Sequence, residues 1–232
     1  MKGTQTMPVV WKTNVLGAVA RGSSGAGVSP ARQRLQTQAQ DFLRAKGLGE
    51  VWLSYSVVPL DAPASGMLCA GGEWFDAPRM LPETGELTAL AFGVCTLGPI
   101  IEERIKALFS EKRASLALGL DEMANRLLLE GSCRMYERLL SDASKRGLCV
   151  SGELRPGDPG LALESQRAAV RLAHGQEVGV SVNQNFVLSP VKSITVVYGL
   201  GRDLPPAKWS RCDECKSHEK CTVARGAMGT VA

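Results

Sequence analysis

The chain has 232 residues, of which 44% are apolar, so it can bury a substantial core in one large domain or two small ones. Its 27 basic and 23 acidic residues leave a net charge of only +4, without the basic stripe typical of nucleic-acid binders. No window approaches the ~20 apolar residues that cross a bilayer, and no signal peptide is recognisable. We therefore expect a cytoplasmic protein with neither a membrane nor a nucleic-acid partner.

Residues 1–30 are rich in Gly, Ser, Thr and Ala, and we expect them to form a flexible arm. Ser29-Pro30 then predicts a helix start, with Ser29 as the N-cap and Pro30 in the first turn. The helix is expected to end at Gly47, and its apolar residues recur at spacings of three and four along one face.

Residues 51–60, VWLSYSVVPL, have the composition and alternation of a strand, and residues 87–94 predict a second one. A helix follows, for which Thr96 is the candidate N-cap. Apolar residues then recur with helical spacing over residues 114–146, where Gly131 either allows close packing or divides the helix in two. Gly147 is expected to end this region.

Residues 149–154 predict a short strand, and residues 155–160, RPGDPG, predict a turn or loop because they contain two Pro and two Gly. An amphipathic helix is expected over residues 164–173. Residues 179–201 have the highest β-propensity in the chain and are interrupted at Ser189-Pro190, so they predict two neighbouring antiparallel strands at the centre of a sheet. This order of elements favours an α+β fold with a mostly antiparallel, twisted sheet and packed helices.

Residues 189–201, SPVKSITVVYGLG, resemble the closing signature of the activation (reactivation) domain of cobalamin-dependent methionine synthase. They are more similar still to the stand-alone, short-chain relatives that accompany corrinoid methyltransferase systems. Residues 95–109, residues 116–130 and the Arg155-Pro156…Pro159-Gly160 loop are also similar to that family, so the resemblance covers about residues 90–202. It implies a methionine synthase activation domain-like fold.

The resemblance also implies a function, because the family's Arg…Pro-Gly-Tyr loop helps to bind S-adenosylmethionine, the methyl donor that restores inactive cobalamin. It assigns Arg155 and Gly160 to cofactor binding, together with Glu130 as the acidic residue of the central helix. Leu161 stands where the family has Tyr, which weakens the expectation of S-adenosylmethionine binding. Cobalamin itself is expected only through a partner, a corrinoid-binding protein or methyltransferase.

Each candidate also has a structural interpretation. Arg155 has planar donors suited to a carboxylate, but it could instead hold carbonyls of its own loop. Glu130 could be a solvated helix residue, and Asp121 could pair with a neighbouring Lys or Arg. Lys192 and Ser193 could have a structural role in the turn beside Pro190. The two histidines, His174 and His218, have no arrangement typical of a catalytic triad.

Cys212, Cys215 and Cys221 form a C-x2-C-x5-C motif with His218 inside it. Two thiolates on one tight turn can reach one metal, so the motif predicts a zinc site or an iron–sulfur cluster. A redox dithiol and a set of free thiols are the alternatives. The remaining four cysteines, Cys69, Cys95, Cys133 and Cys149, are expected to be small buried residues.

We therefore expect three parts: a flexible arm at residues 1–30, an activation-domain-like domain at 31–202 and a Cys-containing tail at 203–232. The leading functional hypothesis is an accessory protein that docks on a cobalamin-binding protein and assists cobalamin activation or methyl transfer. The alternatives are a non-catalytic binding module that has lost the cofactor site and an iron–sulfur electron-transfer protein.

Overall fold

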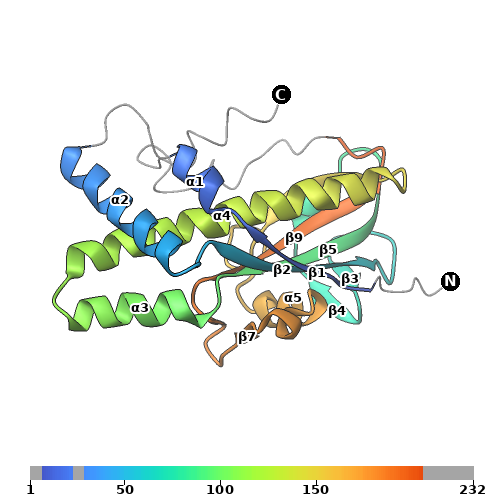
Figure 1. Cartoon of the computed structure of the whole chain (residues 1–232). Coiled ribbons are helices and arrows are strands. Elements are labelled where there is room, and N and C mark those ends of the chain that lie inside the picture. Colours follow the sequence, from blue (N-terminus) through green and yellow to red (C-terminus); the bar gives the residue numbers. More distant parts are fainter. Residues whose placement is uncertain (1–6, 23–28, 206–232) are drawn as a thin grey trace.

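A five-stranded sheet with every neighbouring pair antiparallel forms the centre of the computed structural model, which describes residues 7–22 and 29–205 (Figure 1). The strand order is β1-β2-β5-β9-β6. The bounds are β1 (Val9–Asn14), β2 (Glu50–Pro59), β5 (Glu86–Thr96), β9 (Ser193–Arg202) and β6 (Cys149–Leu154). The predicted α+β class with a mostly antiparallel sheet is confirmed.

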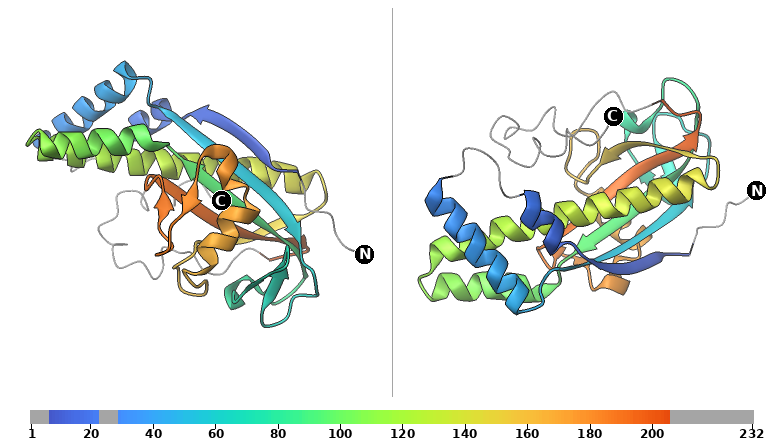
Figure 2. Two further views of the ribbon diagram at one scale, coloured as in Figure 1. Left: turned by 90° about the horizontal axis from the view of Figure 1, so that it is seen from below. Right: turned by 45° about the horizontal axis from the view of Figure 1, so that its top comes forward.

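Two layers cover the two faces of this sheet (Figure 2). The larger layer consists of the helices α1 (Leu16–Gly22), α2 (Pro30–Ala45), α3 (Pro99–Ser110) and α4 (Ala114–Ser144). The smaller layer consists of α5 (Ser165–Leu172), the 3₁₀ turns η1 (Pro78–Met80) and η2 (Gly175–Val178), and the hairpins β3 (Leu68–Ala70)–β4 (Glu73–Phe75) and β7 (Ser181–Val182)–β8 (Leu188–Ser189). Each layer has its own apolar core against the sheet.

The alternation in β2 explains how one strand serves both cores, because successive side chains point to opposite faces. Leu53 and Tyr55 are buried beneath the larger layer. Ser54 and Ser56, on the other face, are also fully buried, and their hydroxyls donate hydrogen bonds to the carbonyl oxygens of Ala173 and Leu172, both at 2.6 Å. Two serines of the sheet thus satisfy carbonyls at the C-terminal end of α5, which have no partner within the helix.

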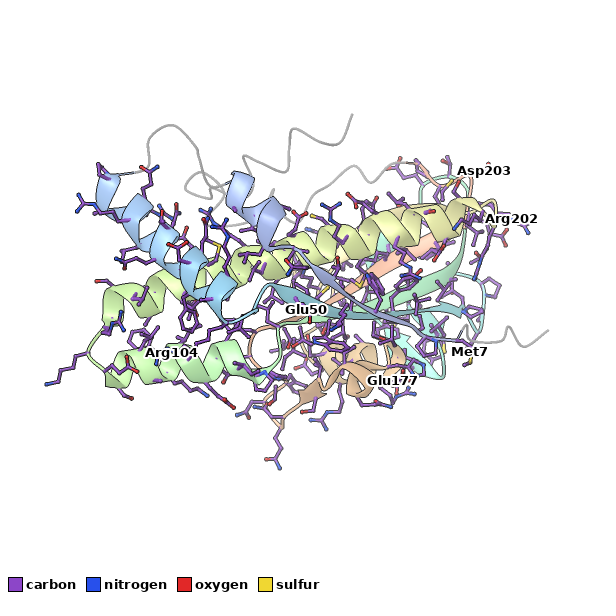
Figure 3. All side chains as sticks on the ribbon, viewed as in Figure 1. Met7, Glu50, Arg104, Glu177, Arg202 and Asp203 are labelled. Carbon is purple, nitrogen blue, oxygen red and sulfur yellow. The ribbon has the colours of Figure 1, made fainter. Side chains whose placement is uncertain are left out.

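Helix α4 is one continuous helix that packs across β2, β5, β9 and β6 (Figure 3). Gly131 does not divide it. A Cβ atom at this position would lie 2.7 Å from Cγ1 of Val51, so glycine lets α4 approach β2 closely. The expected packing of this helix across the sheet is confirmed.

The expectation of a flexible arm over residues 1–30 is wrong for residues 9–22. The strand β1 pairs with β2 from Val9 opposite Tyr55 to Asn14 opposite Glu50, and α1 follows directly. Val15, Leu16 and Val19 are buried in the core of the larger layer. This segment therefore belongs to the domain, since its apolar side chains and backbone groups are satisfied by the sheet and by α4.

The expectation of two central strands over residues 179–201 is only partly correct. The second half forms β9, which has partners on both sides, but the middle strand is β5. The first half forms only the short hairpin of the two-residue strands β7 and β8, because the Oδ1 atom of Asn183 accepts hydrogen bonds from the backbone of Asn185 and Val187 and turns the chain. Side-chain bonds of this kind compete with strand pairing.

Two local expectations also need correction. The N-cap of α3 is Gly98, and the Thr96 hydroxyl instead accepts a hydrogen bond from the Gly98 backbone at 3.0 Å. Cys69 and Cys95 are buried as expected, whereas Cys133 and Cys149 are exposed. In the part of the chain that the structure describes, no helix is both long and apolar enough to span a membrane.

Candidate functional site

The loop that follows β6 is fixed by hydrogen bonds within itself. The backbone N–H of Arg155 donates to Oδ2 of Asp158, and the N–H of Asp158 donates back to the Arg155 carbonyl. The N–H of Leu161 donates to the Asp158 carbonyl, and the N–H of Gly157 donates to the Leu161 carbonyl. Asp158 therefore holds the loop in one conformation, with Arg155 at its start.

The guanidinium of Arg155 forms an ion pair with Glu153, two residues earlier on β6. Its Nε and Nη2 atoms lie 3.1 and 2.9 Å from the same carboxylate oxygen, Oε1 of Glu153. The other oxygen, Oε2, accepts a hydrogen bond from the Tyr198 hydroxyl at 3.3 Å. Burial beneath α4, with the Glu153 charge adding to it, raises the pKa of Tyr198 well above its usual value, so the hydroxyl stays a donor.

Helix α4 forms the opposite side of this site. Although the Cys133 side chain is partly exposed, the protein atoms packed around it disfavour the thiolate and raise its pKa. The charges of Glu130 and Glu153 raise this pKa further, while Arg155 opposes them. One thiol is therefore within electrostatic reach of both Glu130 on α4 and Arg155 after β6. Glu130 also pairs with Arg134 one turn later, at 3.0 Å.

Two of the three residues predicted for cofactor binding, Glu130 and Arg155, thus both influence the Cys133 thiol electrostatically. Gly160 lies at the other end of the loop against η1, where a Cβ atom would come within 3.1 Å of the Arg79 side chain. Its φ of +91° favours glycine. Leu161 is buried in the core of the smaller layer.

Three other candidates have structural partners. Nζ of Lys192 lies 2.7 Å from Oδ1 of Asp121 and 2.9 Å from Oδ1 of Asn125, which ties the loop before β9 to α4. The Ser193 hydroxyl donates to the carbonyl oxygen of Pro190 at 2.7 Å. These contacts account for the residues as parts of the fold.

The cavities that the structure shows can be compared with the positions of the predicted cofactor residues. A cavity of about 40 Å³ lies near the C-terminal end of α4 between Tyr55, Asp142 and Arg146, and none of the predicted cofactor residues lines it. This volume holds water but no nucleoside.

The predicted metal site lies outside the described residues, since Cys212, Cys215, His218 and Cys221 all follow residue 205. Within residues 7–22 and 29–205, no group of three or more His, Cys, Asp or Glu side chains is placed to hold a metal ion. The metal site therefore stays a prediction from the sequence.

Sequence reasoning missed Glu153 and the role of Tyr198. A signal for Glu153 was present, because residues two apart on a strand share a face and Glu153 and Arg155 flank the buried Leu154. For Tyr198, the sequence predicted a position in a strand but no partner for its hydroxyl group. Its contact with Glu153 depends on the pairing of β6 with β9, which places the two residues opposite each other.

Comparison with known proteins points to one fold. No protein-family model and no curated protein sequence matches the chain. Among solved structures, the crystal structure of the MetH reactivation domain bound to AdoHcy (S-adenosylhomocysteine) is similar, with a TM-score of 0.64 and 12% sequence identity. The match covers 92% of this chain and 85% of that chain. The chain therefore has the fold of the methionine synthase reactivation domain.

Proposed function

We propose that this protein is an accessory protein of a corrinoid-dependent methyltransferase system. It docks on a cobalamin-carrying protein and assists activation of the corrinoid or methyl transfer to it. The observation that carries the proposal is the shared fold, together with Arg155 at the start of a rigid loop after β6. Fold likeness alone supports many functions, so the ligand site needs its own test.

The ligand proposed for the site is S-adenosylmethionine or its product AdoHcy. The residues present fit the amino-acid end of such a ligand. Arg155 supplies planar donors for a carboxylate, and Glu130 supplies negative charge on the facing helix. S-adenosylmethionine would supply the methyl group, while the protein binds and orients it.

A non-catalytic binding module is the second candidate function, and the position of Leu161 favours it. This side chain is 2% exposed and belongs to the core, so the site lacks the aromatic surface that the family's motif offers. Calorimetric titration with AdoHcy and S-adenosylmethionine separates the two candidates. Saturable heat supports the ligand site, and its absence at millimolar ligand, with docking on a cobalamin-carrying protein retained in gel filtration, favours the module.

Replacing Arg155 with lysine should weaken AdoHcy binding by about 1.5–3 kcal/mol, because the charge is kept but the planar set of guanidinium N–H donors is lost. Calorimetry of the Arg155→Lys variant measures the change. Arg104→Lys is the matched control, since Arg104 of α3 also pairs with a carboxylate, Glu111, at 2.6 Å. If the Arg155→Lys variant binds AdoHcy with unchanged affinity, Arg155 does not contact the ligand.

For the tail, we propose that Cys212, Cys215 and Cys221 hold one metal centre, with His218 as a candidate fourth ligand for zinc. Protein purified anaerobically without chelator should contain either stoichiometric zinc without colour, or iron and sulfide with broad visible absorbance. Cys215→Ser should lose the metal, whereas Cys133→Ser, which changes an exposed thiol of the domain, should keep it. Wild-type protein without either metal would contradict the proposal.

A further inference from the structure

The metal centre proposed for Cys212, Cys215 and Cys221 needs a fourth ligand. His218 would place all four ligands on one short segment, residues 212–221. Structural zinc sites typically combine ligands from two separate segments. In iron–sulfur proteins of the plant ferredoxin type, three closely spaced cysteines hold one cluster together with a fourth that is distant in the sequence. Both patterns point to a ligand outside the tail.

The domain contains four cysteines that could supply this ligand. Cys69 and Cys95 are buried, whereas Cys133 and Cys149 are exposed. The protein atoms packed around the Cys133 thiol, and then the charges of nearby glutamates, raise its pKa. They therefore oppose the thiolate that a metal binds. Cys149, the first residue of β6, is the exposed cysteine that remains.

The chain enters the tail beside the strand that carries Cys149. The Ser151 hydroxyl donates a hydrogen bond to the Pro205 carbonyl oxygen at 3.5 Å, and Leu204 is buried in the core of the smaller layer. Cys149 and Ser151 lie two residues apart in the part of β6 that pairs regularly with β9. Their side chains therefore share one face of the sheet. Arg202 and Asp203, labelled in Figure 3, mark this end of the sheet.

The length of the connecting segment allows the tail cysteines to reach Cys149. Cys212 follows Pro205 by seven residues, which span up to about 23–25 Å when extended. Two strand positions separate Cys149 from Ser151, which is roughly 7 Å. The segment is therefore long enough to bring Cys212 to Cys149 and to turn on the way.

We propose that Cys149 is the fourth ligand of the tail's metal centre, so that four thiolates hold the metal and join the tail to the start of β6. This inference rests on the metal centre proposed for the tail and deepens it by naming the ligand that the tail lacks. Four thiolates bind either zinc or an iron–sulfur cluster. A centre shared by tail and domain also stabilises the domain, because the metal binds the folded arrangement of its ligands.

Iodoacetamide labelling under anaerobic conditions, followed by peptide mass spectrometry, tests Cys149 in the wild-type protein. Cys149 should stay unmodified in the metal-loaded protein and become modified once a chelator has removed the metal, because the thiolate that binds the metal is the group that reacts. Cys133, which is also exposed, should be modified in both states. Modification of Cys149 in the metal-loaded protein would overturn the inference.

Variants give a second, independent measurement. Cys149→Ala purified anaerobically should lack stoichiometric metal, whereas Cys133→Ala, the matched control, and His218→Ala should keep it. Urea denaturation of the metal-free proteins should give the same midpoint for Cys149→Ala and the wild type, which shows that the variant folds. Addition of Zn²⁺ should then raise the midpoint of the wild type but not that of Cys149→Ala.

The outcomes separate this inference from the proposed metal centre. If the wild type and Cys149→Ala both carry stoichiometric metal, the tail completes its own site and Cys149 is not a ligand, while the metal centre stands. If the wild type carries no metal, the metal centre itself is wrong, and the role of Cys149 is wrong with it.

Discussion

Replacing Gly201 with alanine should destabilise the protein by about 3 kcal/mol or more, because the added methyl group would meet backbone rather than a movable side chain. A Cβ atom at this position would overlap the carbonyl oxygen of Glu86 and lie 2.8 Å from its carbon. Gly201 pairs with Leu87, next to the irregularity in the pairing of β5 with β9 between Leu87 and Ala89. Gly201 lies just before Arg202, the residue labelled at this end of the sheet in Figure 3.

Urea denaturation of the Gly201→Ala variant measures this effect. Gly119→Ala is the matched control, since the same change in α4 meets only ordinary contacts, the nearest being the Leu35 carbonyl oxygen at 3.4 Å. Alanine at this interior helix position should stabilise the protein by about 0.5–1 kcal/mol. If Gly201→Ala and Gly119→Ala change the free energy of unfolding in the same direction and by a similar amount, the close approach to Glu86 is not what requires glycine at position 201.

The second large effect is expected at the two buried serines of β2. Ser54→Ala and Ser56→Ala should each destabilise the protein by about 1–3 kcal/mol, because each leaves a carbonyl oxygen at the end of α5 buried without its partner. The double variant should lose more than either single one. Since the two serines hold neighbouring carbonyls of one helix end, their effects are expected to be coupled rather than additive.

The free energy of unfolding of the three variants, measured in urea, tests this account. Ser110→Ala is the control: its hydroxyl also donates to a helix carbonyl, that of Lys106 at 3.3 Å, but on the exposed side of α3. Water replaces that bond, so the control should stay within about 0.5 kcal/mol of the wild type. If Ser54→Ala and Ser56→Ala behave like the control, the two hydroxyls do not hold α5 to the sheet.

For the candidate site, the sequence identified the loop and Arg155 through a family resemblance, and it located Glu130 on the facing helix. It could not show that Arg155 already has a carboxylate partner. That partner depends on Leu154 being buried, which sets the faces of Glu153 and Arg155, and on β9 bringing Tyr198 opposite Glu153. From the sequence, Arg155 is expected to bind either a ligand carboxylate or carbonyls of its own loop, whereas in the structure its guanidinium pairs with Glu153.

Elements with local signals could be predicted from the sequence. Ser29-Pro30 starts α2 where predicted, with the Ser29 hydroxyl accepting from the Arg32 backbone at 3.3 Å. The alternation of residues 51–60 gave β2, and the helical spacing after residue 114 gave α4. Caps, periodicity and turn residues act within a few positions of the chain, so they can be read without knowing what the element packs against.

Which segments pair with one another depends on contacts between residues that are far apart in the sequence. The six residues of β1 become a strand because β2 supplies their backbone partners, and their apolar neighbours in α1 find a core beneath α4. Residues 180–188 have stronger β-propensity, yet they form only two short strands, since Asn183 turns the chain away. Strand formation depends on neighbouring strands and burial, which involve residues far away in sequence, whereas the hydrogen bonds of a turn join residues that are close in sequence.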